Sequence, residues 1–291
     1  MYRVILNKKV VMSMKLLICF VVLLCLCGCT QSSAEHIADT QPEVTMTSVE
    51  VETLPKFSCL YDSLDVKEQT VYKEIYNGIK HRQTMIPITG VLSTIQFETL
   101  YNLLLTQAPE LYAVSDTVEY SVMVRTGYVN CLYVNYLYED NNDVVDVIIE
   151  EYTTEVQKRC EGLSDVEKYK IIHDFIIKNT KYAEGNIGYD SIYGVFVESK
   201  ATCAGYAKAF KYLCDAVDIN CLCVTGIANG NHMWNMVNVD GQWYAIDCTW
   251  DDPDFNDKTV LYHDYFMLKM EDISETHTLD YIYTDFMECG L

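Results

Sequence analysis

The stretch Lys200-Ala-Thr-Cys-Ala-Gly-Tyr-Ala-Lys-Ala-Phe210 (KATCAGYAKAF) places one cysteine in front of a run of small residues and good helix formers. This composition predicts a helix over residues 202–217 that starts near Cys203. The free N–H groups and the macrodipole at a helix N-terminus favour an anion, here the thiolate of Cys203. Gly205 adds little bulk, which suits close approach of the backbone. Cys203 is therefore a candidate nucleophile, although a cysteine in a cysteine-rich chain is more often structural.

A hairpin further along the chain supplies two possible partners for this thiol. Asp240-Gly241 is a two-residue turn signal between the strand-like segments 233–239 and 242–249. If these two residues form the loop, the numbers of paired positions add up to 481. His232 and Asp247 are then diagonal neighbours on one face, within reach of an imidazole–carboxylate hydrogen bond.

Asp247 is the stronger clue of the two, because it lies inside the apolar run 243–248, where an unpaired carboxylate is costly to bury. Together, Cys203, His232 and Asp247 form a nucleophile, a general base and a carboxylate that orients the base. The N–H of Cys203 is a natural donor to an oxyanion. The sequence gives no argument for a partner of the other five histidines, which are His36, His81, His173, His263 and His277.

The motifs C203-x-G-Y-A, H232-M-W-N and D247-C-T-W-D-D-P resemble the bacterial transglutaminase-like superfamily. The likeness runs from about residue 171 to residue 253 and includes Tyr193-Gly194 and Gly241-Gln-Trp-Tyr. It implies an α+β fold with a papain-like core, in which a helix bearing the cysteine packs on an antiparallel sheet bearing the histidine and the aspartate. It also implies acyl transfer through a thioester on Cys203, with an amide of a protein or peptide as substrate.

The resemblance suggests further site residues and leaves the reaction open. Some relatives use an upstream aromatic or amide side chain at the oxyanion, and Tyr193 is the candidate here. Trp234 and Trp243 share the face of His232 in the predicted register and are candidates for a substrate pocket, with core packing as the alternative. Hydrolysis is slightly favoured over transamidation because water outcompetes amines unless a site excludes it. The alternative function is a non-catalytic binding or scaffolding protein of the same fold.

The N-terminus resembles a bacterial lipoprotein signal over residues 1–29. Four basic residues and no acidic one precede an apolar run, residues 16–26, and Leu26-Cys27-Gly28-Cys29 follows. We expect cleavage before Cys29 and a lipid on its thiol, which places the protein on the membrane, outside the cytoplasm. The alternative is an uncleaved membrane-anchoring helix.

Four segments are predicted along the chain: the signal over 1–29, a flexible tether over 30–56, an accessory α+β region over 57–155 and the transglutaminase-like domain over 156–291. The tether is rich in Thr, Ser, Gln and Glu. In the accessory region, Asp65 and Glu68 suggest a capping box, residues 94–106 a second helix, and Thr126-Gly127 a hairpin between 117–124 and 128–138.

Composition excludes some partners. The formal net charge is −21, and residues 1–29 hold four basic and no acidic side chains, so the remainder is still more acidic and repels nucleic acid and anionic lipid headgroups. The acidic loop from Asp252 lacks the glycine and the final glutamate of a calcium-binding EF-hand, and Cys221-x-Cys223 has no second pair to complete a zinc site. We therefore predict no metal and no cofactor. Nine cysteines follow Cys29, either paired by disulfides around one free thiol or all reduced and buried.

Overall fold

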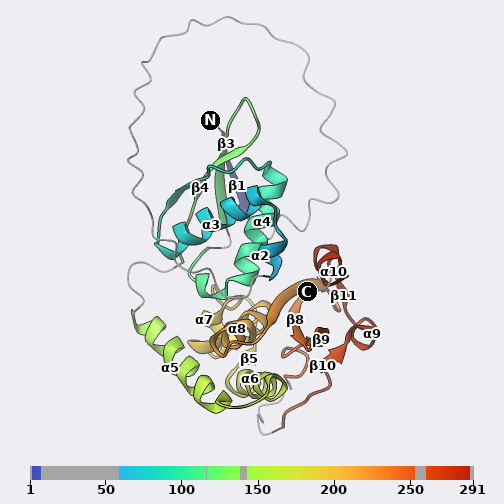
Figure 1. The fold of residues 1–291 in the computed structure, drawn as a ribbon. Helices are drawn as coiled ribbons and strands as arrows, with labels where there is room; N and C mark the ends of the chain where they lie inside the picture. Colours follow the sequence, from blue (N-terminus) through green and yellow to red (C-terminus); the bar gives the residue numbers. More distant parts are fainter. Residues whose placement is uncertain (1, 8–58, 116, 138–142, 253–259, 289–291) are drawn as a thin grey trace, which may run out of the picture.

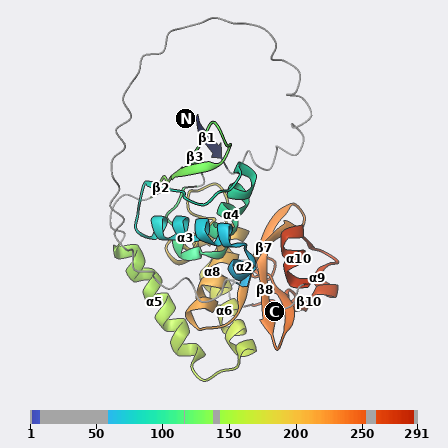
Figure 2. The same ribbon diagram turned by 45° about the horizontal axis from the view of Figure 1, so that its top comes forward.

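The computed structural model describes residues 2–7, 59–115, 117–137, 143–252 and 260–288. In Figures 1 and 2, a four-stranded sheet with its helices forms the N-terminal part, and a five-stranded sheet with its helices forms the C-terminal part. The fold is mixed α and β, as predicted.

The N-terminal part is built on an antiparallel sheet with the strand order β1-β3-β4-β2. Its elements are β1 (Tyr2–Asn7), α2 (Cys59–Ser63), α3 (Val66–Lys80), β2 (Met85–Pro87), α4 (Thr94–Gln107), η2 (Pro109–Leu111), β3 (Thr117–Val122) and β4 (Val129–Tyr133). The predicted capping box at Asp65 is present and starts α3. The predicted hairpin is β3–β4, with Gly127 at a φ of 73° in its turn.

Most of the predicted signal and tether lies outside the described residues, including Cys29, the apolar run 16–26 and the tether 30–56. Tyr2–Asn7, at the start of the predicted signal, forms β1 and pairs with β3. Cleavage before Cys29 would remove β1 and leave β3 as an edge strand. In the described part of the chain, no helix has the length and apolar character needed to cross a membrane.

The C-terminal part is built on an antiparallel sheet with the strand order β10-β9-β8-β7-β11. The helices are α5 (Asp143–Cys160), α6 (Asp165–Asn179), α7 (Ile192–Phe196), α8 (Cys203–Ala216), α9 (Met270–Ile273) and α10 (Tyr281–Glu288). The strands are β5 (Lys181–Tyr182), β6 (Lys200–Ala201), β7 (Cys221–Ile227), β8 (Asn231–Val239), β9 (Gln242–Ile246), β10 (Phe266–Lys269) and β11 (Thr278–Leu279). The sequence patterns did not indicate the elements after residue 260, which supply both edge strands of this sheet.

The β8–β9 hairpin has the predicted register. Val239 pairs with Gln242 and Asn235 with Ile246, so paired numbers add up to 481 along the ladder. Asp240 and Gly241 have φ angles of 53° and 81°, as a two-residue turn between antiparallel strands requires. Successive side chains along each strand therefore point to opposite faces of the sheet, and paired residues share a face.

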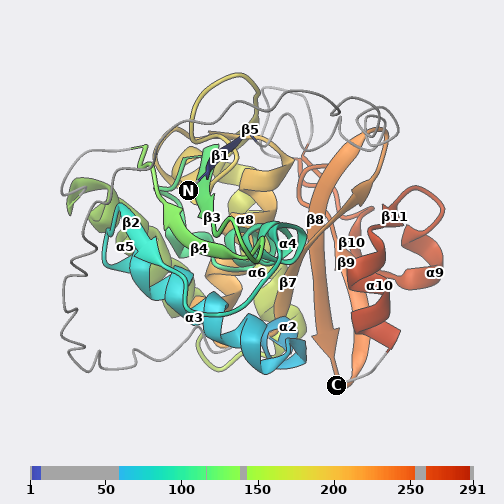
Figure 3. The same cartoon turned by 90° about the horizontal axis from the view of Figure 1, so that it is seen from above.

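Two apolar clusters cover these two faces. One lies between α5–α8 and the face that carries Val237 and Ile246. The other lies on the face that carries Trp234 and Met236, and it includes Ile273 of α9 and Tyr283 of α10. Figure 3 shows the sheet between α8 on one side and α9 and α10 on the other. The cysteine-bearing helix thus packs on an antiparallel sheet, as in the predicted papain-like core.

The N-terminal part contacts the five-stranded sheet directly. Leu103 of α4 joins the cluster around Trp234. The buried side chain of Gln107 donates to the carbonyl of Cys223 at 2.6 Å and accepts from its N–H at 3.3 Å. Because β11 pairs with β7 only at Gly226 and Ile227, Gln107 satisfies backbone groups of β7 that lack a strand partner on that side.

All seven cysteines whose side chains are described are free thiols, and six of them are buried. The reduced alternative therefore holds for this part of the chain. Cys203 is the exception, because it is partly exposed.

Candidate active site

Cys203 is the first residue of α8, and the helix is packed tightly at this end. A Cβ built on Gly205 would lie 2.4 Å from the carbonyl oxygen of Tyr189 and 2.7 Å from Cβ of Ala201. The same oxygen of Tyr189 accepts a hydrogen bond from the N–H of Thr202 at 2.8 Å. The glycine noted in the sequence is therefore required for the contact that fixes the backbone just before Cys203.

Helix α8 and strand β8 bring Cys203 and His232 to the same end of the domain. Nδ2 of Asn235 on β8 donates to the carbonyl of Ala207 on α8 at 2.9 Å. Cys203 lies one helical turn before Ala207, and His232 lies three residues before Asn235. The side chain of Cys203 interacts with the ring of His232 and contributes to the raised pKa of that imidazole.

His232 and Asp247 form the hydrogen bond that the hairpin register predicted. Nε2 of His232 lies 2.6 Å from Oδ2 of Asp247, and both side chains are buried. A carboxylate only accepts, so Nε2 carries the proton. Nδ1 is then the nitrogen that is free to exchange a proton with the thiol of Cys203.

Asp247 is held as an anion by four N–H groups. His232 and His277 donate to Oδ2 at 2.6 and 3.1 Å, and the backbone N–H groups of Thr249 and Trp250 donate to Oδ1 at 2.9 and 3.2 Å. Burial alone would raise the pKa of Asp247, but the two histidines lower it below its ordinary value of 3.8. Asp247 therefore stabilises the folded state above pH 3.8, and this contribution is lost as the pH falls below that value.

The environment of His232 favours the imidazolium. Burial alone would lower its pKa, but hydrogen bonds and charge interactions with Asp247 and Cys203 outweigh burial and raise the pKa of His232 to about 9. The resulting stabilisation is complete below the ordinary value of 6.5 and disappears as the pH rises through about 9. At neutral pH, His232 is therefore mainly the imidazolium, next to Cys203 at the start of α8.

His277 belongs to the site, although the sequence analysis assigned it no partner. It is buried, its Nε2 lies 3.1 Å from Oδ2 of Asp247, and the hydroxyl of Thr276 lies 2.8 Å from its Nδ1. The sequence offers no argument for this partner because Asp247 is 30 residues away, across segments without a local pattern. The ring faces Trp234 and Trp250 at centroid distances of 4.9 and 4.6 Å, so it also fills the apolar wall behind Asp247.

We expect His277 to act as a positioning residue for Asp247. Replacing it with phenylalanine should lower the free energy of unfolding by about 1.5–3 kcal/mol, because a buried carboxylate loses one N–H donor. Glutamine, whose amide N–H can replace Nε2–H, should recover most of this loss. Urea denaturation of the two variants measures the difference, and equal losses would show that His277 only fills space.

The other predicted site residues lie as follows. Trp234 is buried and stacks on His232, with ring centroids 6.0 Å apart, so it forms the inner wall of the site. Trp243 packs at the margin of the cluster around Trp234. Tyr193 donates from its hydroxyl to Oε1 of Glu198 at 3.2 Å. Its role at an oxyanion remains a prediction.

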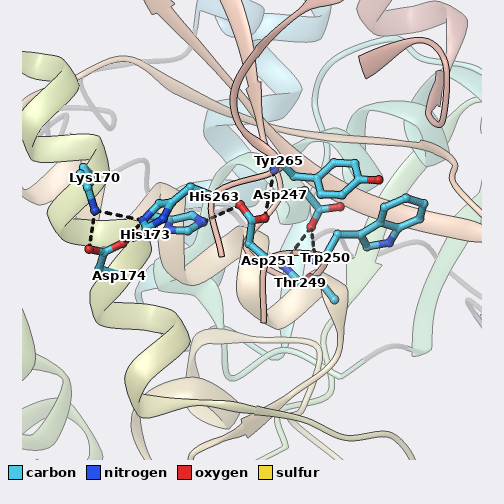
Figure 4. A network of polar contacts seen from close by, with 9 residues as sticks. All are labelled: Lys170, His173, Asp174, Asp247, Thr249, Trp250, Asp251, His263 and Tyr265. Atoms are coloured by element: carbon cyan, nitrogen blue, oxygen red, sulfur yellow. Dashed lines mark hydrogen bonds and ion pairs between the residues drawn. The ribbon is translucent and has the colours of Figure 1, made fainter. Parts of the chain in front are cut away.

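A second polar network continues from the same turn (Figure 4). Asp251, whose N–H donates to the carbonyl of Asp247 at 3.2 Å, accepts from Nε2 of His173 at 3.0 Å and from the N–H of Tyr265 at 3.0 Å. His173 and His263 both approach Asp174. The sequence offers no argument for the partners of these two histidines, because contacts across 78 and 89 residues join them to carboxylates.

One segment of the chain is similar to a known protein superfamily. Residues 151–248 match the family model of the transglutaminase-like superfamily, so the chain contains a transglutaminase-like domain. The mouse and human Kyphoscoliosis peptidases are each 29% identical to the chain over 86 residues, which are 24% of this chain and 13% of theirs. The match thus spans a small part of the length of these relatives.

Two solved structures also resemble the chain. One is described as a TGase, with a TM-score of 0.34 and 16% identity, and covers 44% of this chain and 43% of its own. The other is the periplasmic domain of TgpA from Pseudomonas aeruginosa, with a TM-score of 0.28 and 11% identity, over 42% of this chain and 54% of its own.

Proposed function

We propose that this protein is a cysteine acyl-transfer enzyme that acts outside the cytoplasm on amide bonds of proteins or peptides. The observation that carries the proposal is the continuous chain of contacts from Cys203 to His232 to Asp247, with the pKa of His232 raised to about 9. The matched family and the name of the Kyphoscoliosis peptidases support the same class of reaction.

In the proposed first step, the thiolate of Cys203 attacks the carbonyl carbon of the amide and forms a C–S bond. In this proposal, the N–H of Cys203 donates to the oxyanion. The imidazolium of His232 gives its proton to the amide nitrogen as the C–N bond breaks, which releases an amine and leaves a thioester.

In the second step, a water molecule or a second amine attacks the thioester while His232 takes its proton. The C–S bond then breaks and restores the thiolate, giving a carboxylic acid in hydrolysis or a new amide in transamidation. Asp247 keeps the proton of Nε2 in place through both steps, so that Nδ1 handles the transferred proton. We favour hydrolysis, because partial exposure of Cys203 gives water access to the thioester.

The proposed location rests on the signal-like N-terminus, with Cys29 as the lipid-bearing residue. A membrane anchor there would hold the acyl-transfer domain at the cell surface, where proteins and peptides are available as substrates. Metabolic labelling with a fatty acid tests this point, since the label should be absent from a Cys29→Ala variant.

The thiolate of Cys203 can be tested directly by alkylation with iodoacetamide between pH 5 and 8, followed by mass spectrometry. At pH 5.5, an ordinary thiol is ionised in only about one molecule in 10³, so N-acetylcysteine reacts slowly. Cys203 should react at least about 10²-fold faster than this reference, and His232→Gln should remove the advantage. A rate equal to that of the reference would favour a non-catalytic scaffold of the same fold.

The two branches of the reaction are separated by incubating the protein with casein and a tagged primary amine. Hydrolysis creates new peptide termini, whereas transamidation incorporates the tag. Cys203→Ala is the control for both readouts. If neither product exceeds this control while Cys203 remains hyper-reactive, casein is not a substrate and the reactive thiol still supports acyl transfer.

A further inference from the structure

A cluster of possible metal ligands lies outside the proposed acyl-transfer site. His173 and Asp174 are neighbours on α6, and His263 precedes β10. Oδ1 of Asp174 lies 3.2 Å from Nδ1 of His173 and 2.7 Å from Nε2 of His263. The three side chains each present one ligand atom, and all three atoms lie within 4.8 Å of one another. In the tetrahedral coordination of Zn²⁺, neighbouring ligand atoms stand about 3.3 Å apart, so only small shifts would be needed.

The hydrogen bonds of His263 are in conflict without a metal. Its Nε2 lies 2.7 Å from an oxygen of Asp174, which requires a proton on Nε2. The same Nε2 lies 3.0 Å from Nζ of Lys170, which only donates and requires a lone pair on Nε2. One nitrogen cannot meet both requirements. A metal ion would resolve the conflict, because it takes the lone pair of Nε2 and the charge of Asp174 together.

The ammonium of Lys170 lies against Asp174, so this carboxylate already attracts a cation. Nζ of Lys170 lies 2.7 Å from Oδ2 of Asp174, and the lysine side chain is 51% exposed. An exposed lysine can turn into solvent when a divalent ion takes its place, with little cost to the fold.

Asp251 orients the ring of His173, as a carboxylate commonly does beside a histidine that binds a metal. Nε2 of His173 donates to Oδ2 of Asp251 at 3.0 Å, and the N–H of Tyr265 holds the other carboxylate oxygen at 3.0 Å. His173 and Asp251 are both fully buried. A histidine that binds a metal with one nitrogen usually donates its other N–H to a carboxylate, which fixes the tautomer and the direction of the lone pair.

We propose that His173 Nδ1, the carboxylate of Asp174 and His263 Nε2 bind a divalent transition metal, with Zn²⁺ as the best match. Two imidazoles and one carboxylate suit Zn²⁺ and exclude a preference for Ca²⁺ or Mg²⁺, which take oxygen ligands. His263 is 32% exposed, so water can reach the cluster and act as the fourth ligand.

The bound metal would link α6 to the segment before β10 and, through Asp251, to the turn that carries Asp247. We therefore assign it a stabilising role on the loop behind the acyl-transfer site. The other histidine–carboxylate group, formed by His232, Asp247 and His277, is different in kind. There, both Nε2–H groups donate to Oδ2 of Asp247 without conflict, so the group is complete without a metal.

The test uses a Cys203→Ala background, which removes the reactive thiol as a zinc ligand. Equilibrium dialysis against Zn²⁺ with elemental analysis should give one ion per chain, and thermal unfolding should shift to higher temperature. His263→Gln should weaken Zn²⁺ binding by about 10-fold or more. His81→Gln, which removes an exposed histidine in the turn after α3, should change nothing.

Two further measurements distinguish this site from adventitious binding. Lys170→Met removes the competing ammonium and should tighten Zn²⁺ binding, whereas a purely ionic network predicts no gain. Co²⁺ substitution should give a visible spectrum without the thiolate charge-transfer band. Equal Zn²⁺ affinity of the parent and His263→Gln, or a thiolate band, would overturn the proposal. Activity does not enter these readouts, so failure here leaves the proposed acyl transfer unaffected.

Discussion

Asparagine in place of Asp247 is expected to lower kcat/KM for amide cleavage by about 10²- to 10⁴-fold. The amide keeps the shape of the carboxylate, but its NH₂ group can face Nε2 of His232 and donate to it. The imidazole proton then moves to Nδ1, which points to the thiol, and the ring can no longer accept a proton there. Steady-state kinetics on a peptide amide measures the loss.

The Asp247→Asn variant should also change how kcat/KM for amide cleavage depends on pH. The pKa of His232 is raised to about 9 because hydrogen bonds to Asp247 and Cys203 outweigh burial. Without the charge of Asp247, burial has more weight and the pKa of His232 falls, so the alkaline limb of kcat/KM for amide cleavage moves from about pH 9 to lower pH. Asp240→Asn removes a carboxylate from the turn of the same hairpin and is the matched control. A change in kcat/KM below about 3-fold in Asp247→Asn would contradict the orienting role.

Alanine in place of Gly205 should destabilise the protein and disable the site together. Ordinarily, glycine to alanine inside a helix gains about 1 kcal/mol. Here the new methyl group would meet the carbonyl oxygen of Tyr189 at 2.4 Å, and backbone atoms cannot move aside cheaply. Overpacking of this kind costs about 1–3 kcal/mol, so a net loss of stability is expected.

The displaced backbone is the one that holds the N–H of Thr202, directly before Cys203. A shift of about 1 Å at Cys203 can cost about 10²-fold in rate, so the alkylation advantage of Cys203 should fall as well. Gly127→Ala is the control, because its Cβ would meet nothing within 4 Å, although its φ of 73° is strained for alanine. If both variants lose similar stability and both keep a reactive Cys203, the tight contact at Gly205 is not what positions the thiol.

The sequence was sufficient to predict the features that depend on local rules. Asp240-Gly241 determined the hairpin and its register, and the register placed His232 next to Asp247. The small residues after Cys203 predicted the helix and its close approach to the backbone. These predictions work because turn chemistry and strand alternation act within a few residues.

The parts that could not be predicted depend on distant segments. His277 reaches Asp247 only after β10 and α9 have returned the chain to the sheet, and no periodic pattern announced those elements. His173 looks like one more inward position of an amphipathic helix, and only its partner Asp251 reveals a polar role. A single polar side chain on an apolar face carries no signal about which remote residue satisfies it.

The contact of Gln107 with Cys223 bears on how the chain can be divided. The family match begins at residue 151, after Gln107, so a fragment cut there would lose the amide that serves both backbone groups of Cys223. Such a fragment would also expose the part of the apolar surface around Trp234 that Leu103 covers. An unpaired strand edge beside an exposed apolar surface favours self-association, so we expect the C-terminal part to remain soluble only together with the part that precedes it.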